Sequence, residues 1–273
     1  MKKLLLFITS IITVVTLTAC SSSSTKNKLQ EVKEKNKIVL GVSPDYPPYE
    51  FLTTENGNKK VAGADIYLAE QVAKKLGVQV EIQQMAFDSL IAALNANKVD
   101  MVISGVNPTE ERKKAVDFSD VYYTSKGIFV VNKDSEEIKS VADLKNKKIG
   151  VQKGSTYETY AKEQLKMEDK NIQALTDVPS LLQDLKNKKI DAVLIPDDVA
   201  KIAMNKYTDI KISTFTADND PEATGMAIAF KKGKNDSNKE LLEQVNAVIK
   251  EIQDQKAFEK ELDKYAKVAA QSE

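Results

Sequence analysis

The chain has 273 residues with 40 basic and 40 acidic side chains, one cysteine and no histidine. The balanced charge offers no basic footprint for nucleic acid. The missing histidine excludes acid–base, nucleophilic and metal sites that need an imidazole. The single cysteine excludes a disulfide within the chain. We therefore expect no nucleic-acid partner, no metal and no other cofactor.

The N-terminus has the pattern of a lipoprotein leader. In Met1–Ala19, two lysines precede an apolar run that is too short and wrongly flanked for a spanning helix. Leu17–Cys20 reads LTAC and resembles a lipobox, which predicts cleavage before Cys20 and lipidation of its thiol, as in palmitate-bearing lipoproteins. Residues 20–37 are polar and predict a tether. Without residues 1–19, 38 basic and 40 acidic side chains remain, a formal charge of −2.

From Ile38 onward, strand-like and helix-like segments alternate, which predicts an α/β fold with mostly parallel sheets. About 235 residues suffice for one large or two ordinary domains. The expected strands are Ile38–Val42, Val78–Ile82, Val99–Ile103, Gly127–Val131, Lys148–Val151, Ile172–Leu175, Asp191–Ile195 and Met226–Phe230. The expected helices are Ala64–Leu76, Asp88–Ala96, one beginning after Thr109, Ser155–Lys166, Pro179–Asn187, Asp197–Asn205, Ser237–Gln253 and Ala257–Val268.

A ligand of an open α/β sheet binds outside the carboxyl ends of the strands. Applied here, that rule selects five segments, which are Ser43–Phe51, Phe87, Ser104–Arg112, Gly154–Tyr157 and Pro196–Asp198.

The segment before Arg112 is a small polar loop that leads into a helix start, with Thr109 as the N-cap. Backbone N–H groups converge at such a place, and the planar fork of Arg112 can grip a carboxylate with two parallel bonds. The alternative is that Arg112 is a solvated surface charge in the run EERKK.

This part of the chain resembles the family 3 extracellular solute-binding proteins, the amino-acid receptors of bacterial ABC importers. The motifs that carry the resemblance are Phe87, Leu90-Ile91, Lys98-Val99-Asp100, Ser104-Gly105, Thr109-Glu110-Glu111-Arg112 and Phe118-Ser119. The resemblance covers about Lys37 to Val268. It implies a type II periplasmic-binding-protein fold, with two lobes, two hinge strands and a ligand cleft between them. We expect lobe 1 to comprise residues 38–127 and 226–273, and lobe 2 residues 128–225.

The resemblance also implies roles for individual residues. Arg112 would hold the ligand α-carboxylate, with help from Asn107, the backbone near Gly105, and Thr156 in the second lobe. Other positions would form stacking walls and reach the far end of a long ligand. The expected ligand-binding residues are Ser43, Tyr46, Glu50, Phe87, Ser104, Gly105, Asn107, Arg112, Ser155, Thr156 and Asp197.

Some of these positions have simpler interpretations. Ser155 and Thr156 can be ordinary helix caps, although capping residues and anion donors can occupy the same place. Tyr46 and Phe87, the two expected stacking walls, can be core or lid aromatics. Asp45 lies near Glu50 in the sequence and adds negative charge near the expected far end of the ligand.

One position departs from the family pattern. The family places an acidic residue, which pairs the ligand α-ammonium, five residues after the position of Asp191. Here that position is Pro196, which has neither a charge nor an N–H, and Asp197 and Asp198 follow it. Either Asp197 replaces the acid or another group takes the ammonium.

We expect a monomeric, membrane-tethered lipoprotein that captures a polar or basic amino acid and delivers it to an ABC permease. Tyr46 and Phe87 favour arginine, lysine or ornithine, because aromatic faces suit cationic side chains. The alternatives are an enzyme on the same fold, of the cyclohexadienyl dehydratase type, or a sensor that does not feed transport. No pair of carboxylates has a spacing that fixes catalytic roles.

Overall fold

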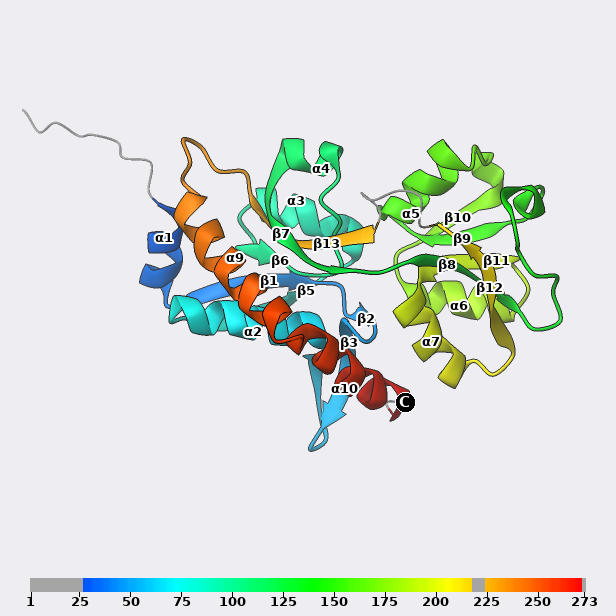
Figure 1. Cartoon of the computed structure of the whole chain (residues 1–273), viewed down its shortest axis with the longest axis horizontal. Coiled ribbons are helices and arrows are strands. Elements are labelled where there is room, and N and C mark those ends of the chain that lie inside the picture. The colour runs from blue at the N-terminus through cyan, green and yellow to red at the C-terminus, as the bar shows by residue number, and fades with distance from the viewer. Residues whose placement is uncertain (1–26, 218–223, 272–273) are drawn as a thin grey trace, which may run out of the picture.

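The computed structural model describes residues 27–217 and 224–271, which form two α/β lobes side by side (Figure 1). The chain crosses from lobe 1 to lobe 2 between strands β7 (Val116–Thr124) and β8 (Gly127–Asn132). It returns between β12 (Ile210–Thr216) and β13 (Gly225–Lys231). This arrangement confirms the expected two-lobed α/β class. The expectation of mostly parallel sheets is wrong, because β13 in lobe 1 and β8 in lobe 2 each run antiparallel to both of their neighbours.

Lobe 1 is built on a five-stranded sheet with the order β5-β1-β6-β13-β7. Strand β1 (Lys37–Val42) runs parallel to β5 (Gln79–Gln84) and to β6 (Met101–Val102). Strand β13 runs antiparallel to β6 and β7. The helices of this lobe are α1 (Lys28–Lys35), α2 (Ala64–Leu76), α3 (Leu90–Asn95), α4 (Glu110–Ala115), α9 (Lys239–Asp254) and α10 (Ala257–Gln271), with the single turn η1 (Phe87–Ser89) ahead of α3.

A small antiparallel sheet extends from lobe 1 and has the order β2-β3-β4. Its strands are β2 (Asp45–Tyr46), β3 (Glu50–Glu55) and β4 (Asn58–Ala62). It places Tyr46 and Glu50 opposite one another in register.

Lobe 2 repeats the α/β plan with the sheet order β10-β9-β11-β8-β12. Its remaining strands are β9 (Ile149–Gln152), β10 (Ile172–Leu175) and β11 (Ala192–Pro196). Its helices are α5 (Thr156–Thr159), which continues as the π-helical segment η3 (Tyr160–Gln164), α6 (Val178–Lys186) and α7 (Asp197–Lys206). The short 3₁₀ helices η2 (Val141–Leu144) and η4 (Asp169–Asn171) also belong to this lobe. The first turns of α6 and α7 lie near lobe 1, because Val178 N donates to Asp45 at 2.9 Å and Asp198 accepts from Tyr49 OH at 2.9 Å.

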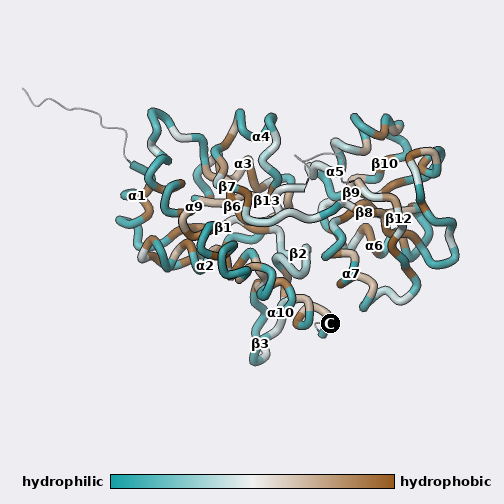
Figure 2. Tube along the Cα trace, in the orientation of Figure 1, coloured by the Kyte–Doolittle hydropathy of each residue, from teal (hydrophilic) through white to brown (hydrophobic). Residues whose placement is uncertain are grey.

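The sheets carry most of the apolar chain, and the outward faces of the helices are hydrophilic (Figure 2). In lobe 1, Leu40, Leu68 and Phe230 are fully buried, and in lobe 2 Phe129 and Leu194 are. Burying apolar surface in this way supplies the main favourable term of folding.

The structure corrects several expected elements. The turn-rich segment after Ser43 forms the β2-β3-β4 sheet, and β7 and β12 are strands that the periodicity did not indicate. The lobe boundaries also shift, because Gly127 pairs with Pro196 inside lobe 2 and Gly225 pairs with Thr124 inside lobe 1. Strands β7 and β12 both pair through ladders with register shifts, and such strands lose the strict alternation by which a strand is predicted from sequence.

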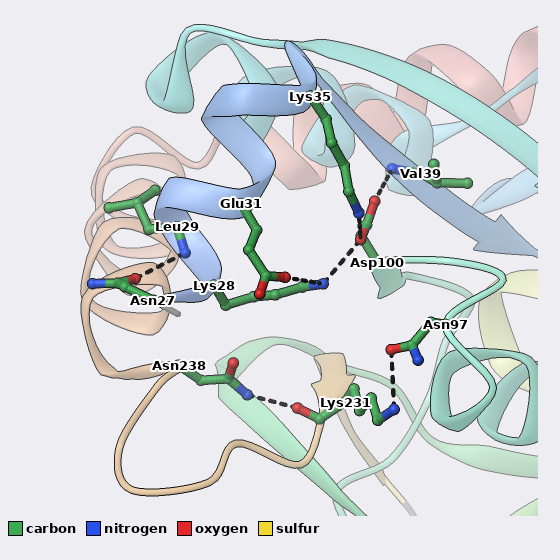
Figure 3. Close-up of polar contacts among 10 residues, drawn as sticks. All are labelled: Asn27, Lys28, Leu29, Glu31, Lys35, Val39, Asn97, Asp100, Lys231 and Asn238. Atoms are coloured by element: carbon green, nitrogen blue, oxygen red, sulfur yellow. Dashed lines mark hydrogen bonds and ion pairs between the residues drawn. The ribbon is translucent and has the colours of Figure 1, made fainter. Parts of the chain in front are cut away.

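The expected tether is also corrected, because residues 28–35 form helix α1 and pack on lobe 1. Leu29 and Val32 are buried, and the Asn27 side chain caps the helix by accepting from Leu29 N at 2.9 Å. Lys28 Nζ and Lys35 Nζ lie 3.1 and 3.3 Å from Asp100 Oδ1 (Figure 3). The other Asp100 oxygen accepts from Val39 N at 3.1 Å.

The expected signal peptide and Cys20 lie outside the described residues. Within 27–217 and 224–271, no helix is both long enough and apolar enough to cross a membrane. The same ranges hold no cluster of three or more acidic, histidine or cysteine side chains arranged for a metal ion.

Asp100 should determine whether α1 stays docked. Burial alone would raise the pKa of Asp100, but the Val39 N–H and the ammonium groups of Lys28 and Lys35 lower it. Asp100→Asn should therefore lower the unfolding free energy by about 2 kcal/mol and expose the lysines of α1 to trypsin. The difference in unfolding free energy between wild type and Asp100→Asn should shrink as the pH falls through the lowered pKa of Asp100, since the wild-type carboxyl is then neutral as well.

Calorimetry and timed trypsin digestion measure these effects. Asp134→Asn is the control, because Asp134 pairs with Lys188 on the surface of lobe 2. Equal digestion of α1 in wild type and Asp100→Asn would contradict the assigned role.

Candidate functional site

Arg112 lies on the short helix α4, whose N-cap Thr109 accepts from Arg112 N at 3.2 Å. Its guanidinium donates to two neutral carbonyls, Asn107 O at 3.0 Å and Gly154 O of lobe 2 at 2.9 Å. Burial lowers the pKa of Arg112 to about 10, which leaves it protonated at neutral pH. Within the described part of the chain, no carboxylate forms an ion pair with this cation.

Other predicted residues meet Arg112 across the two lobes. Thr156 Oγ1 donates to Asn107 Oδ1 at 3.1 Å, and Asn107 Nδ2 donates to Gly225 O at 2.7 Å. The Phe87 ring lies 5.6 Å from the Arg112 guanidinium carbon, within cation–π range. A groove of about 630 Å³ between the lobes is lined by Phe87, Arg112, Ser155 and Thr156 among others.

Ser104 and Gly105 form a loop that rests on a buried polar network in lobe 1. Gly105 has φ +57°, a conformation that favours glycine, and its N–H donates to Asp65 Oδ2 at 3.1 Å. Tyr122 OH lies 3.0 Å from both Asp65 oxygens. Asp65 is fully buried at the first turn of α2. The Asp65 carboxyl of α2 therefore holds the loop that follows β6.

Glu50 belongs to this network rather than to the groove that Arg112 lines. Its side chain is 1 % exposed, and its Oε1 accepts from Ser104 Oγ at 2.6 Å. The Ser104 oxygen in turn accepts from Ser43 N at 3.1 Å, so its single O–H is already committed to Glu50. Ser104 can therefore offer a ligand only its backbone groups and a remaining lone pair.

The Glu50 and Asp65 carboxyls are coupled. Burial and the charge of Asp65 raise the pKa of Glu50 well above its usual range, and burial raises the pKa of Asp65 to about 6. Oε2 of Glu50 is buried and receives no donor from the described residues. A proton on Glu50 removes this penalty, because the carboxyl can then donate to Asp65. A pair that shares one proton in this way carries a single negative charge.

The remaining predicted residues lie around this centre. Tyr46 is 9 % exposed, with its ring 5.9 Å from that of Tyr49 and its edge against Gly105. Ser155 caps α5, donating to Gln152 O at 2.6 Å and accepting from Glu158 N at 3.3 Å. The helix-cap interpretation of Ser155 is therefore confirmed.

Asp197 points along its own helix. Its Oδ2 lies 2.7 Å from Lys201 Nζ, and its Oδ1 is 3.5 Å from Lys126 N. Pro196 is buried at the N-cap of α7. In this conformation the Asp197 carboxylate already has two protein partners, and the assignment of the ligand ammonium to Asp197 or to another group stays a prediction.

Sequence reasoning missed Asp65 and Tyr122. Asp65 sits one residue into an amphipathic helix, where an acidic residue is ordinarily a solvated partner of the helix dipole. The available signal was its place among buried neighbours, since Ala64 and Ile66 flank it on the apolar side of α2.

Comparison with known proteins gives a consistent result. The model of the bacterial extracellular solute-binding proteins, family 3, matches residues 38–268. The chain is 40 % identical over 265 residues to the arginine-binding extracellular protein ArtP of Bacillus subtilis, covering 95 % of this chain and 96 % of that protein. It is 32 % identical over 266 residues to a probable histidine-binding protein of Campylobacter jejuni, covering 97 % and 99 %.

A solved structure shows the same likeness. An amino-acid ABC transporter substrate-binding protein of Streptococcus pneumoniae, bound to L-arginine, superposes with a TM-score of 0.82 at 33 % identity. The superposition covers 89 % of this chain and 98 % of that one.

The Glu50 carboxyl should make folding pH-dependent. Its raised pKa means that the folded state keeps a proton that the unfolded state releases. The stability of the fold therefore falls as the pH rises above the pKa that Glu50 has in the unfolded chain. Glu50→Gln mimics the protonated acid, donating to Asp65 and accepting from Ser104. We expect it to raise the melting temperature at pH 8 by roughly 3–5 °C and to change little at pH 4.5.

Thermal scans from pH 4.5 to 8 test this expectation. Glu55→Gln serves as the control, because Glu55 is exposed in the same strand, β3. If Glu50→Gln is less stable than wild type at every pH, the proton assignment is wrong.

Proposed function

The chain belongs to the bacterial extracellular solute-binding proteins, family 3, whose members serve ABC importers, and we propose that its ligand is a basic amino acid bound between the lobes. The matched relatives and solved neighbours are substrate-binding proteins rather than enzymes, and this chain is likewise a binding protein.

The observation that carries the proposal is that Arg112 forms no ion pair with a carboxylate of the described residues, although the charge of Glu111 acts on it through space. This cation is desolvated and donates to two neutral carbonyls, one from each lobe. A ligand carboxylate at its free N–H groups would supply the missing opposite charge and two parallel hydrogen bonds. Every α-amino acid carries such a carboxylate, so Arg112 explains binding of the class rather than the choice within it.

Negative charge near the Ser104–Gly105 loop supports a basic ligand. Glu50 and Asp65 together carry one buried negative charge, and Asp45 adds another at neutral pH, since burial raises its pKa only to about 6. These groups already have protein partners, so their contribution is through the electrostatic field rather than direct contact. Tyr46 and Phe87 add aromatic faces for a cationic stem.

Arginine comes first among basic ligands, with lysine and ornithine next. The Bacillus subtilis relative is named for arginine, and the Streptococcus pneumoniae structure holds L-arginine. Glutamine is the second candidate, because a solved ancestral arginine-binding protein, 38 % identical to this chain with a TM-score of 0.72, is bound to glutamine.

The ligand class is tested by calorimetric titration with arginine, lysine, glutamine, glutamate and leucine side by side. We expect arginine to bind with an affinity near micromolar, roughly −8 kcal/mol, and glutamate and leucine to bind weakly or not at all. Tight binding of glutamate or leucine with no response to arginine or lysine would refute the proposal.

Arg112 should contribute equally to every bound amino acid. Arg112→Ala should weaken binding by about 3–5 kcal/mol, and Arg112→Lys should restore only part, because the fork geometry is lost. Lys114→Ala is the control, because Lys114 is exposed on the same helix. Unchanged affinity in a correctly folded Arg112→Ala protein would exclude Arg112 as the carboxylate-binding residue.

We further propose that lipid on Cys20 anchors the protein on the outer side of the cytoplasmic membrane, from where it delivers ligand to the permease. The support is the lipobox-like LTAC after an apolar leader. Cys20→Ser should release the protein from the membrane or block its processing, as cell fractionation would show. A Cys20→Ser protein that remains in the membrane fraction would contradict the anchor.

A further inference from the structure

Two carboxylates, one from each lobe, accept hydrogen bonds from the opposite lobe. Asp45 belongs to β2 of lobe 1 and binds groups of lobe 2, and Asp198 belongs to α7 of lobe 2 and binds groups of lobe 1. In Figure 1, β2 lies at the edge of lobe 1 that faces α6 and α7.

Both oxygens of the Asp45 carboxylate accept hydrogen bonds. Its Oδ1 accepts from Ser43 Oγ at 2.6 Å within its own lobe. Its Oδ2 accepts from Gln152 Nε2 at 3.0 Å and from Val178 N at 2.9 Å, both in lobe 2. Val178 is the first residue of α6, where the backbone N–H lacks an intrahelical partner and the helix dipole favours a negative charge.

The Asp198 carboxylate mirrors this arrangement from the other lobe. Its Oδ2 accepts from Tyr49 OH at 2.9 Å and from Tyr123 OH at 3.2 Å. Tyr49 is fully buried and is packed against Tyr123 and Phe258, with ring centroids 6.0 and 6.5 Å apart. Burial and the charge of Asp198 raise the pKa of both phenols, so each keeps the O–H that it donates.

These bonds exist only while the lobes are together. When the lobes part, Asp45 loses the α6 N-terminus and Asp198 loses both tyrosines, and water takes their place. An interaction of this kind favours the closed form by the difference between the two states. Tyr49, Tyr123 and Asp198 do not line the groove beside Arg112, so their contribution does not require contact with a ligand.

We propose that Asp45 and Asp198 form a reciprocal clasp that holds the two lobes closed and sets the rate at which bound ligand is released. The proposal rests on the proposed function, since release presupposes a ligand between the lobes. Arg112 and Thr156 provide the ligand-side closure, and the clasp provides closure energy that is independent of the ligand.

The test compares Asp198→Asn, Tyr49→Phe and the double variant in the full chain, with arginine as the probe. Tyr49→Phe keeps the buried ring and removes only the hydroxyl. Each single variant should release arginine roughly tenfold faster, the change expected for a hydrogen bond to a charged group. Association rates should stay within about twofold, because encounter precedes closure. The double variant should be little worse than Asp198→Asn alone, because Tyr49→Phe removes one of the two hydrogen bonds that Asp198→Asn already weakens.

Asp134→Asn is the matched control, as an exposed carboxylate paired within lobe 2, and thermal unfolding confirms that each variant is folded. If wild type binds arginine and the folded variants release it at the wild-type rate, the clasp is excluded. If no amino acid binds wild type, the proposed function fails, and small-angle scattering then decides the clasp. The ligand-free double variant must be more extended than wild type, and equal radii of gyration would overturn it.

Discussion

Lobe 1 depends on one buried acidic centre. The carboxyl of Asp65 accepts from Tyr122 and from the N–H of Gly105, and through Glu50 it is linked to Ser104. Helix α2, the β2-β3 hairpin, the loop after β6 and strand β7 therefore meet at a pair of acids. Burying two carboxyls is costly unless they share a proton and fill their hydrogen bonds. Because the hydrogen bonds of these acids are filled in this way, the loop that leads to Arg112 is held in one position.

The same centre shows how charge is distributed across the cleft. The cation at Arg112 is desolvated and lacks an ionic partner in the described chain, whereas the acids near Tyr46 are already satisfied by protein donors. Under the proposed function, a zwitterion with a cationic tail would find one strong contact at its carboxylate and a favourable field at its other end. The affinity for amino acids as a class and the selectivity among them would then come from different parts of the proposed site.

The alternating α/β plan and the position of Arg112 in a helix that begins after Thr109 could be predicted from the sequence, because both follow from local patterns. Helical spacing marks α2, and the T-x-E-R turn places Arg112 at a helix start after a strand. Asp65 and Asp198 could not be found this way, because each looks like an ordinary first-turn acid and gains its role from partners far away in the sequence. Helix α1 was missed for a similar reason, since its polar composition is compatible with a linker until Asp100 is brought beside it.

Docking of α1 on lobe 1 shortens the free chain between Cys20 and the folded protein. If lipid holds Cys20, the chain from there to Lys37 could span about 60 Å when fully extended, but only the part up to Lys28 remains to span, about 28 Å. The maximum length of the free tether is therefore roughly halved. The tether joins the folded protein at the α1 end of lobe 1, away from lobe 2 (Figure 1). An anchored protein is then confined to a shallow layer above the bilayer, which raises its effective concentration at a membrane-embedded partner.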